Sequence, residues 1–598
     1  MSASNVSDAA VETFVLVPGR TSRQGTTLNE GKATDGYLDE TGTLLMSLND
    51  MQRLGVEAGR RVRLRSAHGH IVVPCKPGRK EELPDGVLFI PYGPASSRLM
   101  GGDTHGTGMP DSKGIDVTLQ VLSADSESAE AADDADPTTP PPTPTPPRAG
   151  AKNGGAKKVV ENATCTFCGC VCDDMVLTVE DNHITKAKNA CVLGKAWFLN
   201  HDAVEDQPAA TIDSRPAELD EAADHAARIL TGARYPIVYG LSDTTCEAQR
   251  VALAVADRIG ACVDTTTSVC HGPSGMAFQG VGEITCTLGE VKNRADLVIF
   301  WGSNPADSHP RHFSKYSTMP KGRFVPRGRK DRTVVLVDVR KTKSAAAADI
   351  FIPVRPRKDF EVLWALRALV KGVKIDADEI ESQTGVPLEV LVDLTERMKS
   401  CRFGVLFFGM GLAMTRGKHI NAEAALALAR DLNRFTRFTA KPMRGHGNVT
   451  GADNVVAWTT GYPFGVSLGR GYPRFNPGEF TTVDTLVRRE ADAALIIAAD
   501  PLANFPEPAR EHLRSIPTVV LDPKLSITAQ HATVHFTTAT YGINTAGTVY
   551  RMDDVPIPLR PALESPFPSD EEVLKKIDEA IKRRSDEATK GGGTGPSS

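Results

Sequence analysis

The sequence has no hydrophobic run that approaches the roughly 18 to 20 residues of a membrane span. Its first residues, MSASNVSDAAVETFVLVPG, lack the basic and then apolar pattern of a secretory signal. It also has no excess of positive charge, since 69 Lys and Arg face 74 Asp and Glu for a net charge of -5. A nucleic-acid surface would need a strongly basic face. We therefore expect a cytoplasmic protein that binds neither membranes nor nucleic acids.

The eleven cysteines are not spread as a disulfide framework would spread them over a small secreted domain. Five of them lie in one short stretch, and the other six are scattered along the chain. The clustered residues are Cys165, Cys168, Cys170, Cys172 and Cys191. A tight group of thiols in a large chain of this kind indicates a metal site.

A chain of 598 residues is too long for one hydrophobic core, so we expect roughly three or four domains. Residues 123–160 are acidic, then rich in Pro and Thr, then rich in Gly and Lys, which predicts a disordered linker. The other predicted boundaries are a barrel over 1–122, a cysteine-bearing subdomain over 161–215, α/β domains over 216–584 and a disordered tail over 585–598.

The segment before the linker carries short strand patterns broken by turns. VRLRSAHGHIVVPCKP and GVLFIPYGP contain β-branched runs that end at Gly or Pro. SLNDMQRLGVEAGRRV predicts one short helix, capped by Asn49 or Asp50 and ending near Gly55. These patterns favour a small β-rich barrel with one or two helical turns.

After the linker, buried-strand patterns alternate with helical ones, which predicts an α/β fold with doubly wound parallel sheets. The strand patterns are YPIVYG, ADLVIFWG, TVVLVDVR, FGVLFFG, ADAALIIAAD and PTVVLD, and the helical ones EAQRVALAVADRIG, DFEVLWALRALVKG and INAEAALALARDLNRF. Several strands end in short polar residues or glycine, where such sheets bind ligands. These are Gly302, Asn304, Asp338, Gly409 and Asp500. No G-x-G-x-x-G accompanies them, so each is weak evidence alone, and Asp500 or Asp522 could equally form a turn.

The cysteines in CTFCGCVCDD give the pattern C-x2-C-x3-C from Cys165, Cys168 and Cys172, and Cys191 follows. Soft thiolates at such spacing on a turn favour a [4Fe-4S] cluster. A zinc site, which usually uses two separated C-x2-C knuckles, and an empty degenerate site are the alternatives. Cys170 exceeds the four ligands of a cubane and has no assigned role.

The stretch SVCHGPSG places Cys270 beside His271 in a loop rich in Gly and Pro. A cysteine hydrolase takes its base from a distant segment, so this pair does not fit one. On the residues alone, a functional thiol and a buried cysteine with a loop histidine remain about equally plausible.

The motifs CTFCGCVCDD, ACVLGKAW, SVCHGPSG, FWGSNPADSHPRH and the segment from MTRGKHIN to MRGHGNVTG resemble the B subunit of formylmethanofuran dehydrogenase, a molybdopterin oxidoreductase similar to formate dehydrogenase. The resemblance runs from about residue 162 to 561. Before the linker, PGRTSRQGTTLNEGK, GVLFIPYGPASSRL and THGTGMPDSKG resemble the D subunit, a double-psi barrel in that family. The chain therefore resembles a fusion of the two subunits.

The resemblance implies that Cys270 coordinates molybdenum or tungsten held by two pterin guanine dinucleotides. It also implies that His271 lines the substrate pocket and handles the proton, and that Arg444 holds formate through its guanidinium fork. His446 and Asn448 would line the same pocket. Lys195 would lie between cluster and pterin, although the spacing CVLGK differs from that of formate dehydrogenases. The remaining expected contacts with the dinucleotides are Gly302, Ser303, Asn304, His309, Asp338, Arg340 and Asp359, with Asn49, Asp50 and the loop GTGMPDSKG in the barrel.

The function implied is the interconversion of CO2 and formate, with electrons passed through the [4Fe-4S] cluster. Implied partners are an amidohydrolase A-like subunit, a C-like subunit and a ferredoxin-like electron carrier. Two alternatives remain open, a structural subunit of a formyltransferase/hydrolase complex that has lost its redox centres and a stand-alone formate dehydrogenase. The sequence does not choose between molybdenum and tungsten, nor between reduction and oxidation as the physiological direction.

Overall fold

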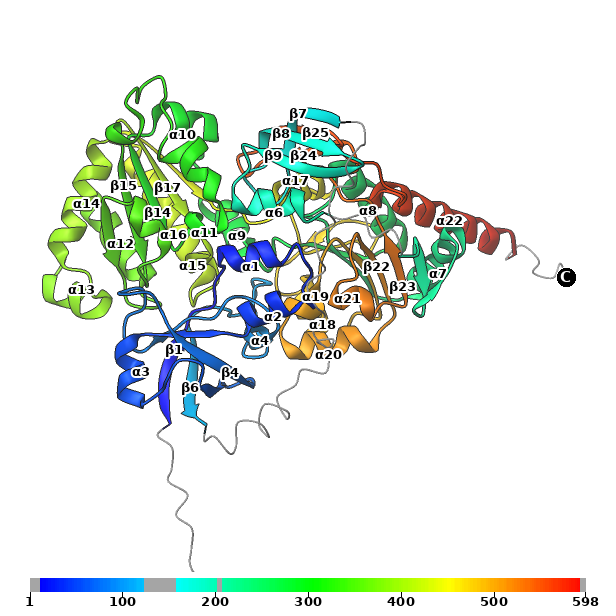
Figure 1. Ribbon diagram of the computed structural model, residues 1–598, viewed down its shortest axis with the longest axis horizontal. Coiled ribbons are helices and arrows are strands. Elements are labelled where there is room, and N and C mark those ends of the chain that lie inside the picture. The colour runs from blue at the N-terminus through cyan, green and yellow to red at the C-terminus, as the bar shows by residue number, and fades with distance from the viewer. Residues whose placement is uncertain (1–10, 123–156, 202–206, 592–598) are drawn as a thin grey trace, which may run out of the picture.

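A computed structural model describes residues 11–122, 157–201 and 207–591, with side chains up to residue 587. Figure 1 shows the N-terminal body, in blue, lying against two larger α/β bodies. The linker prediction for residues 123–156 lies outside the described residues.

The N-terminal body is a barrel-like sheet of six strands. They are β1 (Glu12–Leu16), β2 (Leu44–Met46), β3 (Arg61–Arg65), β4 (His70–Pro77), β5 (Val87–Leu88) and β6 (Ile115–Val121), in the order β2-β4-β3-β6-β1-β5. The two edges meet because Leu45 and Phe89 exchange backbone hydrogen bonds of 2.7 and 2.9 Å. Alternate side chains of these strands, such as Phe14, Leu16, Val62 and Leu64, fill the interior.

The predicted helix in this body is α3 (Leu48–Leu54), and its end is confirmed. Gly55 closes it in the left-handed conformation with a φ of 66°. The predicted cap was wrong, since Ser47 caps the helix and its hydroxyl accepts from the Asp50 N–H at 3.0 Å. Ser47 has the extended backbone that an N-cap needs, whereas Asp50 already lies in the first turn.

The first α/β body holds a sheet of five parallel strands. They are β14 (Leu297–Trp301), β15 (Thr333–Asp338), β16 (Ile350–Pro353), β17 (Phe403–Phe408) and β18 (Arg437–Pro442), in the order β16-β15-β14-β17-β18. One face packs against α12 (Asp359–Val370), α14 (Leu388–Ser400) and α16 (Lys418–Leu432). The other face packs against the cysteine-bearing segment. Both faces are therefore buried, which explains the continuous apolar strand patterns.

The second α/β body holds a sheet of nine strands, of which the central five are parallel. These five are β12 (Pro236–Gly240), β13 (Cys262–Thr265), β21 (Ala493–Ile497), β22 (Thr518–Asp522) and β23 (Val534–Thr537). The flanking strands are β10 (Ala210–Ile212), β11 (Arg215–Pro216), β19 (Val466–Ser467) and β20 (Arg474–Phe475).

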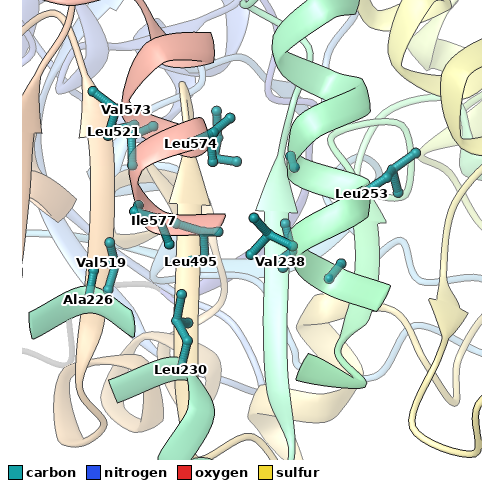
Figure 2. Packing of buried hydrophobic residues seen from close by; sticks show 14 of the residues in the cluster. Ala226, Leu230, Val238, Leu253, Leu495, Val519, Leu521, Val573, Leu574 and Ile577 are labelled. Carbon is teal, nitrogen blue, oxygen red and sulfur yellow. The ribbon is translucent and has the colours of Figure 1, made fainter. Parts of the chain in front are cut away.

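The predicted double winding of this second sheet is confirmed. Figure 2 shows Leu495, Val519 and Leu521 on one face, packed against Ala226, Leu230 and Ile577. The helices on that face are α7 (Leu219–Gly232), α8 (Cys246–Ile259) and α22 (Asp570–Gly591). Neighbouring residues, such as Ala494 and Ile496, face the opposite core with α18 (Thr482–Val487) and α20 (Glu507–Ser515).

The cysteine-bearing segment forms β7 (Lys157–Cys165), β8 (Cys172–Glu180), β9 (His183–Lys188) and α6 (Val192–Leu199). The end of the predicted linker was therefore wrong, because β7 begins at Lys157 and pairs with β8 up to Glu180. The sheet ladder overrides the polar composition of these first residues. A small pair, β24 (Gly547–Tyr550) and β25 (Pro556–Leu559), lies beside this segment (Figure 1).

The predicted start of the tail at residue 585 was also wrong, because α22 continues to Gly591. Residues with good helix propensity, such as Arg583 and Glu587, allow the helix to extend past the end of its buried face. Among the described residues, no helix combines the length and the apolar character needed to cross a bilayer.

Candidate functional site

A cavity of about 530 Å³ lies where the barrel-like body meets the carboxyl ends of both parallel sheets. Its wall contains Gly302 after β14, Asp338 at the end of β15 and Asp500 and Asp522 near the ends of β21 and β22. The predicted site residues that line it are Cys270, Gly302, Ser303, Asn304, His309, Asp338, Arg340, Asp359 and His446. The rule that α/β sheets bind ligands beyond their carboxyl ends therefore holds for two sheets at once.

Glycines open the cavity at the end of the five-stranded sheet. Gly302 has a φ of 54°, and a Cβ on Gly409 would lie 2.4 Å from the carbonyl oxygen of Gly302. A Cβ on Gly411 would lie 2.5 Å from the Cα of Gly302. Any side chain here would push apart the two strand ends, so the chain presents bare backbone to the cavity.

Cys270 lies in the loop between β13 and α9 (Gly272–Val281), and its Sγ faces Met410 Sδ at 3.7 Å. Burial raises the pKa of the thiol, while the positive charges of Arg444 and Arg20 and a hydrogen bond from the Gly445 N–H oppose that rise. Two nearby arginines and a backbone donor favour a thiolate as soon as a metal replaces the proton.

His271 is buried and does not line the cavity. Its Nε2 lies 3.2 Å from the carbonyl oxygen of Met443, which can only accept, so Nε2 carries the hydrogen. Its Nδ1 then accepts from the Ser274 hydroxyl at 3.0 Å. Burial, reinforced by Arg444, lowers the pKa of His271 to about 3. The imidazole is neutral and both of its nitrogens are engaged.

Arg444 lies just behind the cavity wall, in a buried ion pair between its NH1 and Asp453 Oδ2. The hydroxyls of Thr265 and Thr267 each donate to Asp453 at 2.9 Å. Burial raises the pKa of Asp453, and the adjacent guanidinium works against that rise. Two hydroxyls and one carboxylate thus hold the arginine in one place. Asp453 lies in α17 (Val449–Thr460), and no sequence pattern marked it as a partner.

Several side chains of the cavity wall are held in place by hydrogen bonds. His309 Nε2–H donates to the carbonyl oxygen of Arg444 at 2.8 Å. Asp359, at the start of α12, accepts from Trp301 Nε1 at 2.8 Å, and burial raises its pKa to about 7. Asn304 donates to Asp307 at 2.7 Å and accepts from Ser344 at the same distance. These bonds fix the side chains before any ligand arrives.

Arg340 lines the cavity, but its guanidinium pairs with Glu82 of the barrel-like body at 2.7 Å and lies 3.9 Å from the centre of the Phe89 ring. The contact joins the barrel to the end of β15.

The barrel also contributes Arg20 and Lys113 to the cavity wall. Burial, together with the charge of Arg340, lowers the pKa of Lys113 to about 7. The sequence pointed to the GTGMPDSKG loop, which contains Lys113, but did not single out Arg20.

Besides His271, four residues are not where the sequence placed them. Lys195 is exposed on α6 and lines neither the large cavity nor the cysteine site. The spacing CVLGK puts it on the solvent side of the first helical turn. Asn49, which is exposed, donates to Asp85, and Asp50 accepts from the Gly86 N–H, and neither lines the cavity. Asn448 is fully buried and holds the carbonyl oxygen of Thr244 at 2.7 Å.

The five clustered cysteines surround a small second cavity, which also contains Gly194 and Arg311. Cys165 and Cys172 are direct partners across β7 and β8, while Cys191 precedes α6. A Cβ on Gly194 would lie 3.1 Å from Cys165 Sγ, so glycine leaves room among the sulfurs. Within the described residues, no three His, Cys, Asp or Glu side chains converge tightly enough for one metal ion.

Phe167 lines both the small cavity and the large one, so the two cavities lie close to each other. Sequence patterns gave no reason to select it. The wall of the large cavity also contains buried hydroxyls, among them those of Thr266 and Thr342, that have no hydrogen-bond partner among the described residues. Orphaned polar atoms in a glycine-lined cavity with several cations fit a large polar anionic ligand such as a pterin dinucleotide.

Comparison with known proteins agrees with this geometry. The family model described as Molydopterin dinucleotide binding domain matches residues 14–115. The B subunit of the tungsten-containing formylmethanofuran dehydrogenase 2 of Methanocaldococcus jannaschii is 46% identical over 433 residues, which are 71% of this chain and 99% of that protein. Protein FwdD of the same organism is 40% identical over 101 residues, which are 17% of this chain and 75% of that protein.

Among solved structures, the formyltransferase/hydrolase complex from Methylorubrum extorquens, determined with methylofuran, gives a TM-score of 0.52 at 24% identity. The match covers 63% of this chain and 99% of the other, and at this identity it shows a shared fold. The high identity over nearly the whole of the B subunit is the stronger finding. The chain belongs to the formylmethanofuran dehydrogenase family of molybdopterin oxidoreductases, as a B subunit with a D-like, molybdopterin dinucleotide-binding domain in the same chain.

Proposed function

We propose that this chain is the redox subunit of a formylmethanofuran dehydrogenase complex and interconverts CO2 and formate. The observation that carries the proposal is the cavity itself, which brings Cys270, the strand-end glycines of one sheet and cations of the barrel-like body to one place. In this proposal the barrel-like body is the double-psi domain that closes over two pterin guanine dinucleotides. The segment that contains β7, β8, β9 and α6 would form the iron–sulfur subdomain, and the two α/β bodies would form the catalytic part.

Cys270 would hold molybdenum or tungsten through its thiolate, and the metal–pterin group would supply two-electron redox chemistry there. Arg444 would attract and orient the formate carboxylate, since its charge is already fixed by Asp453. Asp359, with a pKa of about 7, and Lys113 would contact the guanine, ribose or phosphate groups. The close packing of barrel and sheets would exclude bulk water from the reacting atoms.

Four of the clustered cysteines, Cys165, Cys168, Cys172 and Cys191, would bind a [4Fe-4S] cluster. Phe167 lines both this site and the large cavity, so electrons would cross a short distance. The electron carrier would be a ferredoxin-like protein, and an A-like amidohydrolase and a C-like subunit would complete the complex.

The test is metal and iron analysis of the anaerobically purified protein, together with formate oxidation using a viologen dye as electron acceptor. About four irons and one molybdenum or tungsten per chain, with formate-dependent dye reduction, are the expected result. Protein without these metals would instead be a structural subunit, as in the formyltransferase/hydrolase alternative. Co-purification with an amidohydrolase distinguishes the methanofuran enzyme from a stand-alone formate dehydrogenase.

A further inference from the structure

The reaction HCOO⁻ → CO2 + H⁺ + 2 e⁻ releases one proton, and a group in the cavity must accept it. His271 is poorly arranged for this task. Its Nε2–H already donates to Met443 and its Nδ1 accepts from Ser274, so neither nitrogen is available to a substrate. It is 1% exposed and does not line the cavity.

His446 has the opposite arrangement. It lies in the loop between β18 and α17, lines the large cavity, and its side chain is 37% exposed. Its Nδ1 lies 2.9 Å from Asp243 Oδ2, and a carboxylate can only accept, so Nδ1 carries the hydrogen. Nε2 is then an acceptor, and the structure gives it no hydrogen-bond partner among the described residues.

Asp243 is itself held in place from several sides. The Tyr541 hydroxyl lies 3.1 Å from Oδ1 of Asp243 and 2.8 Å from the carbonyl oxygen of Thr166. The Gly447 N–H donates to the same carboxylate at 3.4 Å. Although burial alone would raise the pKa of Asp243, the adjacent His446 and the hydrogen bonds from His446, Tyr541 and Gly447 keep it low. The carboxylate is therefore ionised and fixes the tautomer of His446.

The loop that carries His446 reaches the sulfur of Cys270. The preceding residue, Gly445, donates its N–H to Cys270, and Arg444 comes directly before it. The same loop thus contains three groups next to one another: a backbone N–H that interacts with Cys270, the buried cation Arg444 and the imidazole of His446. Such an Asp–His arrangement is the usual way to hold a general base in one orientation.

We propose that His446 is the proton acceptor of the formate reaction, oriented by Asp243 and Tyr541. The proton of formate goes to Nε2 of His446, and the two electrons go to the redox groups of the proposed function and then to the acceptor. In the reverse direction the same nitrogen returns the proton to CO2. The inference rests on the proposed function but assigns the proton to a different residue than the sequence did.

The test compares H446A and D243N with the wild-type holoenzyme in formate-dependent viologen reduction. Removing a general base should lower kcat about 10²- to 10⁴-fold for H446A without changing the iron or the molybdenum or tungsten content. D243N should lower kcat by a smaller factor, and added imidazole should restore part of the H446A activity. H105Q is the matched control, because His105 also pairs with a carboxylate, Asp111 at 3.2 Å, but lies on the barrel surface outside the cavity.

A second measurement does not depend on turnover. Diethyl pyrocarbonate labelling of the wild-type holoenzyme, mapped by mass spectrometry, should modify His446 and leave His271 unmodified, and formate should slow the labelling of His446. Retention of activity by H446A, or labelling of His271 in place of His446, would overturn the inference while the proposed function stands. A wild-type holoenzyme that carries its metals but does not oxidise formate overturns the proposed function and this inference together.

Discussion

The two sulfur sites of this molecule are assembled in different ways. The clustered cysteines come from one continuous segment, in which β7, a turn, β8 and the start of α6 bring five thiols around a small cavity. The Cys270 site needs loops from both parallel sheets and side chains from the barrel-like body. The first site is local and readable from spacing, whereas the second exists only once three bodies pack together.

This difference decides what can be found in each site without a structure. The cysteine spacing alone identified the candidate ligands of the local site. At Cys270, the partner of Arg444 is Asp453, the partner of Arg340 is Glu82, and neither pairing has a sequence signature. Long-range ion pairs and cavity walls depend on how elements dock, and docking is not encoded in any short motif.

The largest expected effect is at Cys270 itself. C270A should abolish formate oxidation, because the described residues of the cavity wall include no other thiol to hold the metal. Iron content should stay near four per chain, since the cysteine site is separate. The measurements are viologen reduction and metal analysis. C401A is the control, because Cys401 is a half-buried thiol that bonds the carbonyl oxygen of Met398 far from both sites. If C270A also loses iron, the two sites are not independent.

The second-largest effect is expected from substitutions of the clustered cysteines. C172S should lower the iron content well below four per chain and stop electron transfer to external acceptors, since a cubane needs all four thiolates for stability. C170S should keep its iron, because Cys170 exceeds the four proposed ligands. Iron analysis and electron paramagnetic resonance of the reduced protein are the measurements. Loss of iron in C170S with retention in C172S would reassign the ligands.

The free energy of unfolding tests the buried ion pair between Arg444 and Asp453 at the Cys270 site. D453N should destabilise the fold by about 3–5 kcal/mol, because it leaves the Arg444 charge buried without a partner. D393N should change the free energy of unfolding by less than about 1 kcal/mol, since Asp393 pairs with Arg397 on the surface. Denaturant unfolding of the two variants measures both values. Equal effects would show that the buried pair does not hold the site together.

The smallest effect is a pH dependence where the cysteine segment meets the five-stranded sheet. His312 is fully buried, 4.6 Å from the Phe407 ring, and burial lowers its pKa to about 3. Its unfolded value is about 6.5, so the unfolded state binds an extra proton between these limits. The contribution of His312 to the free energy of unfolding is therefore fully present above pH 6.5. As the pH decreases toward 3, this contribution falls by up to about 1.4 kcal/mol per pH unit.

H312Q should remove this contribution, so its stability should fall less steeply than that of the wild type between pH 6.5 and 5. Unfolding in denaturant at several pH values provides the comparison. H183Q serves as the control, because His183 lies on the exposed end of β9. An identical slope in H312Q and wild type would contradict the argument.

The fold was predictable in outline because the two parallel sheets are buried on both faces. Strands such as LVIFW and TVVLVD are therefore apolar throughout, and their helices carry the usual periodic pattern. The ends of elements were less predictable. Residues 157–160 were predicted to belong to the linker because of their polar composition, but they form the start of β7. The N-cap of α3 was predicted to be Asn49 or Asp50, but it is Ser47. In both cases hydrogen bonds to partners elsewhere outweighed local preference.

The sequence by itself determined the family, the spacing of the clustered cysteines and the strand-end residues of the cavity. Each of these is a local property, set by spacing or by the position of a residue in its own element. Only the tertiary structure decided that His446, and not His271, presents a free nitrogen to the cavity, and that Lys195 faces solvent. Hydrogen-bond partners such as Met443, Ser274 and Asp243 determine which nitrogen is free, and they come from segments far apart in the chain.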